Sequence, residues 1–281
     1  MARIAHLSDV HFGSHDPAIV AALEDLLPAL APDLVVISGD LTQRARVSQY
    51  RLARAFIERL EAAGLAVLAI PGNHDVPLYD VARRFVRPLH RYRRYVDENL
   101  CPWHEGEAIA VLGINTARSL TFKDGRISHE QMALIQERFA AVPPGKTRIL
   151  VTHHPLFAMP IGDGEGLTEA VGRRGEALDA VAAAGVHLLL AGHFHRSFTR
   201  SARDMAETAG PELVIQAGTA TSTRVRAGER QSFNRIDIAA SDRVALTVYG
   251  WGEQGFSPGT PAAYVFENAR WRDAQAAAPA C

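Results

Sequence analysis

Short apolar runs alternate with amphipathic segments along the first part of the chain, and this alternation constrains the fold more than any other feature. The runs RIAHLS (3–8), LVVIS (34–38) and LAVLAI (65–70) are rich in Val, Ile and Leu. Between them lie two stretches with apolar residues at helical spacing, one opening at the cap-like pair Asp16-Pro17 and one ending near Gly64. Strands that alternate with helices predict parallel strands and an α/β fold.

The rest of the chain continues this pattern and then changes it. Strand-like runs at 108–114, 147–152 and 186–191 are separated by predicted helices at 128–140 and 173–184. Farther on, ELVIQA, SFNRIDI and RVALTVY are separated by short turns, which is typical of antiparallel strands. We therefore predict a single domain over residues 1–270, followed by a frayed tail at 271–281.

Residues 76–107 interrupt the alternation, and we interpret them as an insertion or lid. Pro88 prevents a single helix there, and six arginines lie between positions 83 and 94. Their guanidinium groups would either grip a substrate phosphate or lie on a solvated helix face. An apolar stripe is predicted to pack on the core or on a second subunit, so a homodimer through this segment is a hypothesis. The stripe consists of Val81, Phe85, Leu89, Tyr92 and Val96.

Composition narrows the class of protein. With 281 residues and 47% hydrophobic content, the chain can bury a large core. Its formal net charge of -1 provides no global field to recruit nucleic acid or an anionic membrane. No stretch reaches the ~18 apolar residues of a membrane helix, so we expect a cytoplasmic protein without a membrane partner. Cys101 and Cys281 are too few for a disulfide framework or a thiolate zinc site.

Five of the strand-like runs end in residue types that ligate metals or transfer protons. In chain order these are Asp9 and His11, then Asp40, then Asn73, His74 and Asp75, then His153 and His154, and finally His193 and His195. Each group alone is also compatible with a turn, a helix cap or a surface loop. In open α/β sheets, however, functional groups gather beyond the carboxyl ends of the strands. We therefore expect the five groups to converge in space.

The converging set predicts a pair of metal ions. Imidazole and carboxylate suit borderline ions such as Mn²⁺, Fe²⁺, Co²⁺ or Zn²⁺, and the lack of thiolate argues against a closed structural zinc site. One ion cannot use so many ligands. Two ions can, if a single carboxylate bridges them at the ~3.5–4 Å spacing of two-metal hydrolases.

The same blocks resemble the five-part signature of the calcineurin-like metallophosphoesterases. In chain order they read DVH (9–11), GD (39–40), GNHD (72–75), THH (152–154) and GHFH (192–195). The short chain, GDLT, and GTATSTR followed by SFN (218–234) are most similar to the bacterial class III cyclic-nucleotide and glycerophosphodiester phosphodiesterase branch. The resemblance implies a four-layer α/β/β/α sandwich with two mixed sheets flanked by helices.

The resemblance also assigns roles to the matching positions. It implies two metal ions, each being Mn²⁺, Fe²⁺ or Fe³⁺, Co²⁺ or Zn²⁺. Asp9, His11 and His195 would hold one ion, Asn73, His153 and His193 would hold the other, and Asp40 would bridge them. His74 would face the leaving-group oxygen and protonate it, with its ring oriented by Asp75 or by a backbone carbonyl, unless Asp75 only caps a helix. His154 would lie outside the ligand set, because adjacent strand positions point to opposite faces.

The expected activity is hydrolysis of small organic phosphodiesters, with 3′,5′-cyclic nucleotides as the first candidate. Hydroxide shared by the two ions would attack phosphorus in line. We expect Arg44, Arg46 and His154 near the substrate, although ordinary surface placement of the two arginines is equally consistent with the sequence. The alternatives are a nuclease or a lipid-headgroup or pyrophosphate hydrolase on the same site, and a non-catalytic interaction scaffold.

Overall fold

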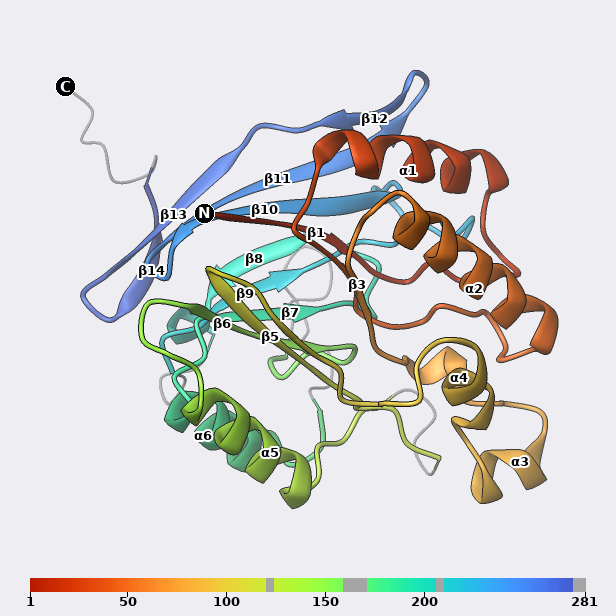
Figure 1. Ribbon diagram of the computed structural model, residues 1–281, viewed down its shortest axis with the longest axis horizontal. Coiled ribbons are helices and arrows are strands. Elements are labelled where there is room, and N and C mark those ends of the chain that lie inside the picture. The colour runs from red at the N-terminus through yellow and green to blue at the C-terminus, as the bar shows by residue number, and fades with distance from the viewer. Residues whose placement is uncertain (120–123, 159–170, 206–209, 275–281) are drawn as a thin grey trace.

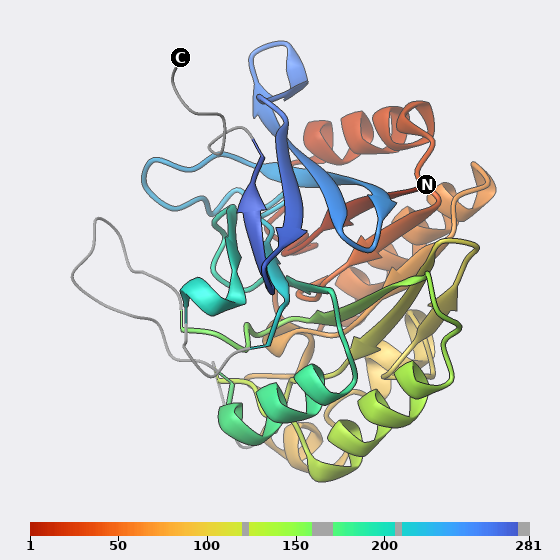
Figure 2. The same ribbon diagram turned by 90° about the vertical axis from the view of Figure 1, so that its left-hand side faces the viewer.

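Two mixed β-sheets lie face to face in this protein, and helices cover their outer sides (Figures 1 and 2). The computed structural model describes residues 1–119, 124–158, 171–205 and 210–274. The four-layer α/β/β/α architecture predicted from the sequence is confirmed.

The first sheet has eight strands, mostly from the two ends of the chain. In hydrogen-bonding order they are β14 (Arg270–Asp273), β13 (Ala262–Glu267), β11 (Arg243–Gly252), β10 (Ser232–Ala240), β1 (Ala2–Leu7), β2 (Leu34–Ile37) and β3 (Val67–Ala69), with β12 (Gly255–Pro258) paired to β11. β1, β2 and β3 run parallel, whereas β10 runs antiparallel to β1. The predicted parallel strands therefore form one half of this sheet.

The second sheet has six strands from the middle of the chain. In order they are β4 (Trp103–Glu105), β5 (Ile109–Ile114), β6 (Thr147–Thr152), β7 (Leu188–Ala191), β9 (Leu213–Gln216) and β8 (Phe198–Ser201). β5, β6, β7 and β9 run parallel, and the two edge strands run antiparallel to their neighbours. The carboxyl ends of β6 and β7 consequently lie at the same edge.

Helices α1 (Pro17–Leu30) and α2 (Val47–Ala62) pack on the first sheet, and α5 (His129–Ala140) and α6 (Arg174–Ala183) pack on the second. The side chain of Asp16 accepts a hydrogen bond from the N–H of Ala18 at 2.8 Å and so caps α1. Ser128 and Gln131 form the predicted capping box of α5. No helix within the described ranges combines the length and the apolar content needed to cross a bilayer.

Strand β2 shows why the central strands are apolar on both faces. Val35 and Ile37 pack in a cluster with residues of α1 and α2. Leu34 and Val36 point the other way and pack in the layer between the two sheets. Because successive strand residues face opposite sides, a strand covered on both sides needs a continuous apolar run.

Parts of the sheets differ from the sequence prediction. The pattern does not predict β4, β8, β12, β13 or β14. ELVIQA forms β9, which runs antiparallel to the edge strand β8 but parallel to β7, and the parallel pairing was not expected. The tail boundary at 271 was also misplaced. Trp271 is only 3% exposed in β14, so residues 271–273 belong to a sheet, while residues 275–281 lie outside the described residues.

The insertion also differs from the prediction. Pro88 separates two short helices, α3 (Val81–Val86) and α4 (His90–Tyr95). Leu89 and Tyr92 of the predicted apolar stripe are buried, as expected. Val81 and Phe85, however, are 61% and 54% exposed, so the stripe does not pack as one surface. The prediction is wrong for α3, which buries Arg84 and leaves these apolar residues exposed.

Candidate metal centre

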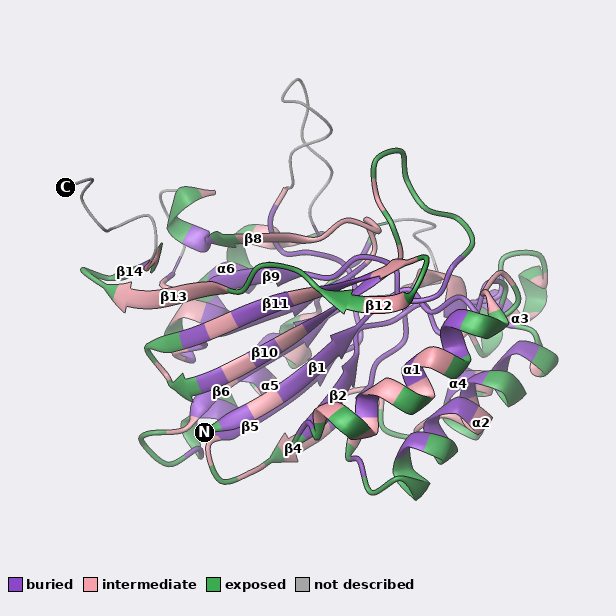
Figure 3. Ribbon diagram, turned by 90° about the horizontal axis from the view of Figure 1, so that it is seen from above, coloured by how far each residue is buried: buried purple, intermediate pink, exposed green. Residues whose placement is uncertain are grey.

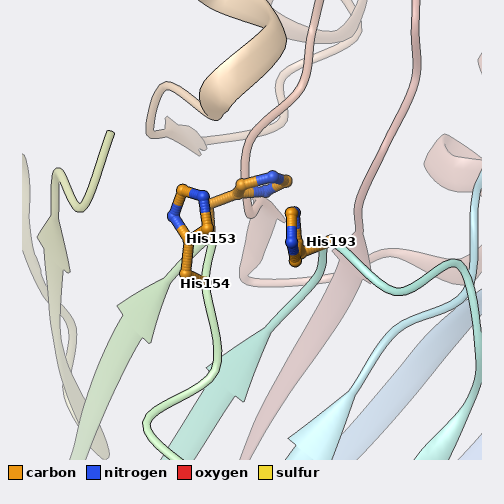
Figure 4. Close-up of side chains that lie close together, drawn as sticks. All are labelled: His153, His154 and His193. Carbon is orange, nitrogen blue, oxygen red and sulfur yellow. The ribbon is translucent and has the colours of Figure 1, made fainter. Parts of the chain in front are cut away.

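The polar groups that follow β1, β2, β3, β6 and β7 meet at one edge of the two sheets. The first three strands belong to one sheet and the last two to the other, so the groups meet across the sandwich. Figure 4 shows one part of this meeting, where His153 and His154 follow β6 and the ring of His193 approaches them from the end of β7. The structure thus brings together residues that are far apart in the sequence.

Asp9, His11 and His195 form one ligand group. Nε2 of His195 lies 3.2 Å from Oδ1 of Asp9, and Nε2 of His11 lies 3.6 Å from the same oxygen. The Nε2 atoms of the two histidines are 3.0 Å apart. Three potential ligand atoms therefore point at one small space.

Asn73, His153 and His193 form the second group, and Asp40 lies between the two. Oδ1 of Asn73 is 3.1 Å from Nε2 of His153 and 3.1 Å from Nδ1 of His193. Oδ2 of Asp40 is 3.3 Å from Nε2 of His153 and 3.8 Å from Nε2 of His11. One carboxylate oxygen thus faces both groups, as a bridging ligand must.

The side chains of the two groups are arranged to bind cations, because without a cation several of their lone pairs face one another. The Nε2 atoms of His11 and His195 face each other, and within the described part of the chain the buried Oδ1 of Asp9 has no hydrogen-bond partner. Lone pairs crowded into a buried space repel one another unless a proton or a cation lies between them. Imidazole and carboxylate donors without sulfur suit borderline divalent ions. The residues can therefore hold two divalent cations.

The pKa shifts of the cluster indicate the same preference for positive charge. Burial alone would raise the pKa of Asp9, but the imidazoles of His195 and His11 hold it well below its usual range. Burial alone would lower the pKa of His153, but the carboxylate of Asp40 raises it to about 9. The buried carboxylates thus stabilise positive charge at this position, whether it is carried by a proton or by a metal ion.

Five of the candidate ligands have a left-handed backbone. The φ angles are 52° at Asp9, 52° at His11, 51° at Asp40, 80° at His193 and 55° at His195. Residues other than glycine adopt this region rarely, at a cost of about 1–3 kcal/mol each, and such residues concentrate at functional sites. The backbone of these loops is therefore less stable than an ordinary loop, and in return the side chains point to one common space.

Two glycines allow the ligand loops to approach each other. Gly39, directly before Asp40, has a φ of +100°, and a Cβ atom there would lie 2.5 Å from Nδ1 of His153. Gly192 touches the loop after β1, and a Cβ atom on it would overlap Oγ of Ser8. Any side chain at either position would push apart loops that belong to different sheets.

His74 lies beside the ligands and not among them. Its ring meets the ring of His11 edge-on, with the centroids 4.9 Å apart. Its backbone N–H donates to Oδ1 of Asp40 at 2.8 Å, and its Nδ1 donates to the carbonyl oxygen of Gln43 at 2.9 Å. The side-chain amide nitrogen of Gln43 also lies 3.1 Å from Nδ1. The closer backbone carbonyl can only accept, so when Nδ1 carries the proton, Nε2 is the nitrogen left to exchange a proton with a bound molecule.

The carboxylate of Asp75 holds the backbone and not the ring of His74. It accepts hydrogen bonds from the N–H groups of Leu41, Thr42 and Gly72 at 3.1, 2.9 and 3.0 Å, and from the hydroxyl of Thr42 at 2.8 Å. The geometry therefore does not support the predicted catalytic role of Asp75. Its four hydrogen bonds fix the loop of Asp40 against the loop of Asn73.

His154 lies closer to the ligands than its place in the sequence suggests. Its ring centroid is 4.6 Å from that of His193, and its Nδ1 is 2.7 Å from the hydroxyl of Thr116. Burial, together with the nearby imidazoles of His153 and His193, lowers its pKa, so the ring is neutral. With 3% exposure, His154 does not favour substrate contact. Its ligand atom lies within 4.8 Å of those of His153 and His193, so these three histidines are themselves a candidate metal-binding group.

Arg44 and Arg46, the predicted substrate-binding arginines, are both exposed. Their backbone N–H groups donate to Oε1 of Gln49 at 2.9 and 3.3 Å, which fixes the loop between β2 and α2. The guanidinium of Arg44 lies over the ring of Tyr79, 5.2 Å from its centroid. Contact of either side chain with a substrate stays a prediction.

Several residues that hold the ligands in place were missed from the sequence. Oγ of Ser8 donates to Oδ2 of Asp9 at 2.6 Å, and the hydroxyl of Thr219 donates to the backbone oxygen of Asp9 at 2.6 Å. Nδ1 of His195 donates to the carbonyl oxygen of Arg224 at 3.1 Å. Thr219 and Arg224 both lie in GTATSTR (218–224), so this block was the signal that could have located them.

Comparisons with known proteins agree with this geometry. Residues 2–197 match the calcineurin-like phosphoesterase family. The chain is 24% identical over 274 residues to the 3′,5′-cyclic adenosine monophosphate phosphodiesterase CpdA of Escherichia coli, which covers 92% of this chain and 93% of that protein. It is 26% identical over 199 residues to the glycerophosphodiester phosphodiesterase GpdQ of Enterobacter lignolyticus, which covers 67% of this chain and 64% of that protein.

The fold is also found among solved structures. A purple acid phosphatase from yellow lupin (Lupinus luteus) seeds superposes with a TM-score of 0.70 at 14% identity. The match covers 98% of this chain but only 54% of the lupin chain. At this identity the comparison establishes the shared fold alone.

Proposed function

Because the chain belongs to the calcineurin-like phosphoesterase family, we propose that it is a two-metal phosphodiesterase that hydrolyses small organic phosphodiesters, with 3′,5′-cyclic nucleotides as the first substrate class. The observation that carries this proposal is the position of Asp40, whose Oδ2 faces His153 of one ligand group and His11 of the other. The similarity to a cyclic-nucleotide and a glycerophosphodiester phosphodiesterase supports a diester as the substrate.

The proposed ligand assignment is the one that the family resemblance implies. Asp9, His11 and His195 would hold one divalent cation, Asn73, His153 and His193 would hold the other, and Asp40 would be shared. When bound, such a pair neutralises phosphate charge and acidifies water. The protein contributes the spacing, because the hydrogen bonds of Asp75 and Ser8 fix the loops that carry the ligands.

His74 is the residue placed to move a proton in this reaction. When a P–O bond breaks, the departing alkoxide needs a proton, and a positioned imidazole supplies it about 10²–10⁴ times faster than an unassisted site. The hydrogen bond from Nδ1 to the carbonyl of Gln43 orients the ring, and in its imidazolium form His74 would transfer the Nε2 proton to the alkoxide. In the proposed reaction His74 is therefore the general acid.

Exposure indicates the side from which a substrate reaches the centre. Asp9, Asp40 and His153 are at most 2% exposed, so they face inward. Asn73, His74, His193 and His195 are partly exposed, and His74 and His195 flank the exposed side of the first ligand group. A phosphodiester therefore enters from the side of His74 and His195, with its leaving group next to the proposed proton donor.

The test is turnover by the purified protein after metal removal and reloading with Mn²⁺, Fe²⁺, Co²⁺ or Zn²⁺. We expect hydrolysis of bis(p-nitrophenyl) phosphate with at least one of these ions, and its absence with all of them would overturn the proposal. A panel of cAMP, cGMP, glycerophosphodiesters and a phosphomonoester then ranks the substrates. A preference for a glycerophosphodiester would keep the diesterase and reject cyclic nucleotides as the first class.

A further inference from the structure

Helix α3 buries a charged side chain and exposes its apolar side chains, which is the reverse of an ordinary surface helix. Its buried residue is an arginine, Arg84, which is only 3% exposed. Val81, Phe85 and Val86 are 61%, 54% and 75% exposed. At 3.6 residues per turn, the exposed Ala82, Phe85 and Val86 point roughly 100–160° away from Arg84, and Val81 lies about 60° from it. The apolar face of α3 thus points away from the core.

Specific hydrogen bonds hold α3 in this orientation. Nε of Arg84 donates to the carbonyl oxygen of Ser119 at 2.7 Å, and its Nη1 donates to that of Pro77 at 3.2 Å. Asp80 caps the helix by accepting from the N–H of Arg83 at 3.1 Å. Rotating the helix so that a valine is buried in place of Arg84 would break these hydrogen bonds. The guanidinium donors would then lose their backbone acceptors.

The exposed apolar residues are concentrated in one place. Within the described residues, five of the eight large exposed hydrophobic side chains lie between positions 78 and 86. We refer to these five as the α3 patch, which consists of Leu78, Tyr79, Val81, Phe85 and Val86. Figure 1 shows α3 at the periphery, beyond α4 as seen from the sheets, and Figure 3 shows it mostly exposed. A protruding apolar cluster of this kind marks an interaction site.

The α3 patch lies in a basic segment of a protein that is acidic elsewhere. Residues 76–96 contain six arginines and one aspartate, a formal net charge of +5, whereas the whole chain carries -1. Of the six, Arg84 is buried and Arg83 pairs with Asp80, and the acidic Asp97 and Glu98 follow directly. Val86 lines a cavity of about 470 Å³ together with Arg87, His90 and Arg93. Arg87 and Arg93 are exposed, and neither forms an ion pair with any residue that the structure describes. This surface therefore suits a partner that is anionic as well as apolar.

We propose that the α3 patch docks the protein on the surface of a membrane that contains anionic phospholipid. Valine and phenylalanine side chains enter the boundary between headgroups and acyl chains, and neighbouring arginines bind the phosphates. A nucleic acid takes apolar side chains as single wedges or thymine-methyl contacts, and it offers no continuous apolar layer for the whole patch. A second copy of the chain is disfavoured, because a twofold contact would place one basic segment against another.

Docking is independent of the proposed hydrolysis and can be tested separately. The full chain is sedimented with vesicles of phosphatidylcholine alone and of phosphatidylcholine mixed with phosphatidylglycerol, at low and at high salt. We expect binding to the mixed vesicles only, weakened by salt. Phe85→Asp and Arg87→Glu should each reduce the bound fraction at least about tenfold. The matched controls Leu52→Asp and Arg51→Glu change exposed residues of α2 outside the patch and should bind like the unmodified chain.

Turnover of bis(p-nitrophenyl) phosphate without vesicles checks that each variant is folded and should equal that of the unmodified chain. If the unmodified chain binds vesicles but hydrolyses nothing, the proposed function fails and the docking proposal stands. Equal binding to neutral vesicles, or equal losses in the α2 controls, would overturn docking. So would light scattering in which the protein is a dimer without vesicles and Phe85→Asp makes it a monomer, because the patch would then belong to a second copy.

Discussion

Oδ2 of Asp40 lies 3.3 Å from Nε2 of His153 and thereby joins the loop after β2 to the loop after β6. The two strands belong to different sheets, so this contact crosses the sandwich at its open edge. The same oxygen faces His11 at 3.8 Å. The consequence is that one carboxylate influences both ligand groups.

Asp40→Asn should therefore affect both metal ions at once. The amide keeps the size of the side chain but removes the charge that two cations would share. We expect bound metal to fall below one equivalent and turnover to fall by at least about 100-fold, since even residues outside the ligand shell can cost 10–100-fold. Elemental analysis and a bis(p-nitrophenyl) phosphate assay measure the two effects. Retention of two equivalents with full activity would show that Asp40 is not shared.

His74→Ala should separate proton transfer from metal binding. The imidazole is not among the ligands, so metal content should be unchanged, whereas kcat should fall by about 10²–10⁴-fold. The fall should be greater for alkyl esters than for p-nitrophenyl esters, because p-nitrophenolate leaves without needing a proton. A loss of metal in parallel with activity would mean that His74 is a ligand, contrary to its position beside His11.

Gly39→Ala tests the close approach of the two sheets, and Gly145→Ala is its matched control. Both glycines have positive φ, at +100° and +93°, but a Cβ atom at Gly145 would meet nothing within 4 Å. Gly145→Ala should cost only the backbone strain, about 1 kcal/mol. Gly39→Ala should cost more and should also lower bound metal, because the new methyl group would displace His153. If urea denaturation showed an equal loss of unfolding free energy in the two variants, and both kept their full metal content, the steric argument would be contradicted.

Glu212→Gln should change stability in a pH-dependent way. Burial raises the pKa of Glu212 to about 7, and within the described residues neither of its carboxylate oxygens has a hydrogen-bond partner. A raised carboxyl pKa means that the folded chain binds the proton more tightly than the unfolded chain. The resulting stability is complete below the unfolded pKa and is lost as the pH rises through about 7.

The neutral amide should therefore stabilise the fold at alkaline pH, by on the order of 3 kcal/mol, and make little difference at acidic pH. Urea denaturation at about pH 5 and at about pH 8 measures this difference. Glu137→Gln, at an exposed position of α5, serves as the control and should leave stability unchanged at both values. An equal effect of Glu212→Gln at both values would show that the carboxyl does not titrate with folding.

The ligands could be predicted from the sequence because their positions follow from local rules. Asp9, Asp40 and His193 each come within two residues of the end of a strand-like run, and parallel strands align their carboxyl ends at one edge. The left-handed backbone at these residues could not be predicted, because it is imposed by the conformation of the loops in the folded protein. Likewise, Asp75 follows His74 in the chain, yet its partners lie in another loop, on Leu41 and Thr42.

The orientation of α3 could not be predicted for a different reason. By spacing alone, Val81 and Phe85 belong to an apolar stripe that should face the core. The helix instead turns Arg84 inward, because the carbonyl oxygen of Ser119, distant in the sequence, accepts its hydrogen bond. Net charge was equally uninformative, since an overall value of -1 conceals a segment of +5. A membrane surface, excluded on that average, becomes a partner to test.

Each ligand group takes residues from both sheets: His11 follows β1 and Asn73 follows β3, while His195 and His193 follow β7. Cations bound there would connect the two halves of the sandwich at the edge where only loops otherwise meet. When metal is bound, the two sheets should therefore unfold together in one cooperative step, and without it each should open separately. Amide hydrogens of β2 and β6 would then exchange at similar rates in the loaded protein and at different rates after chelation.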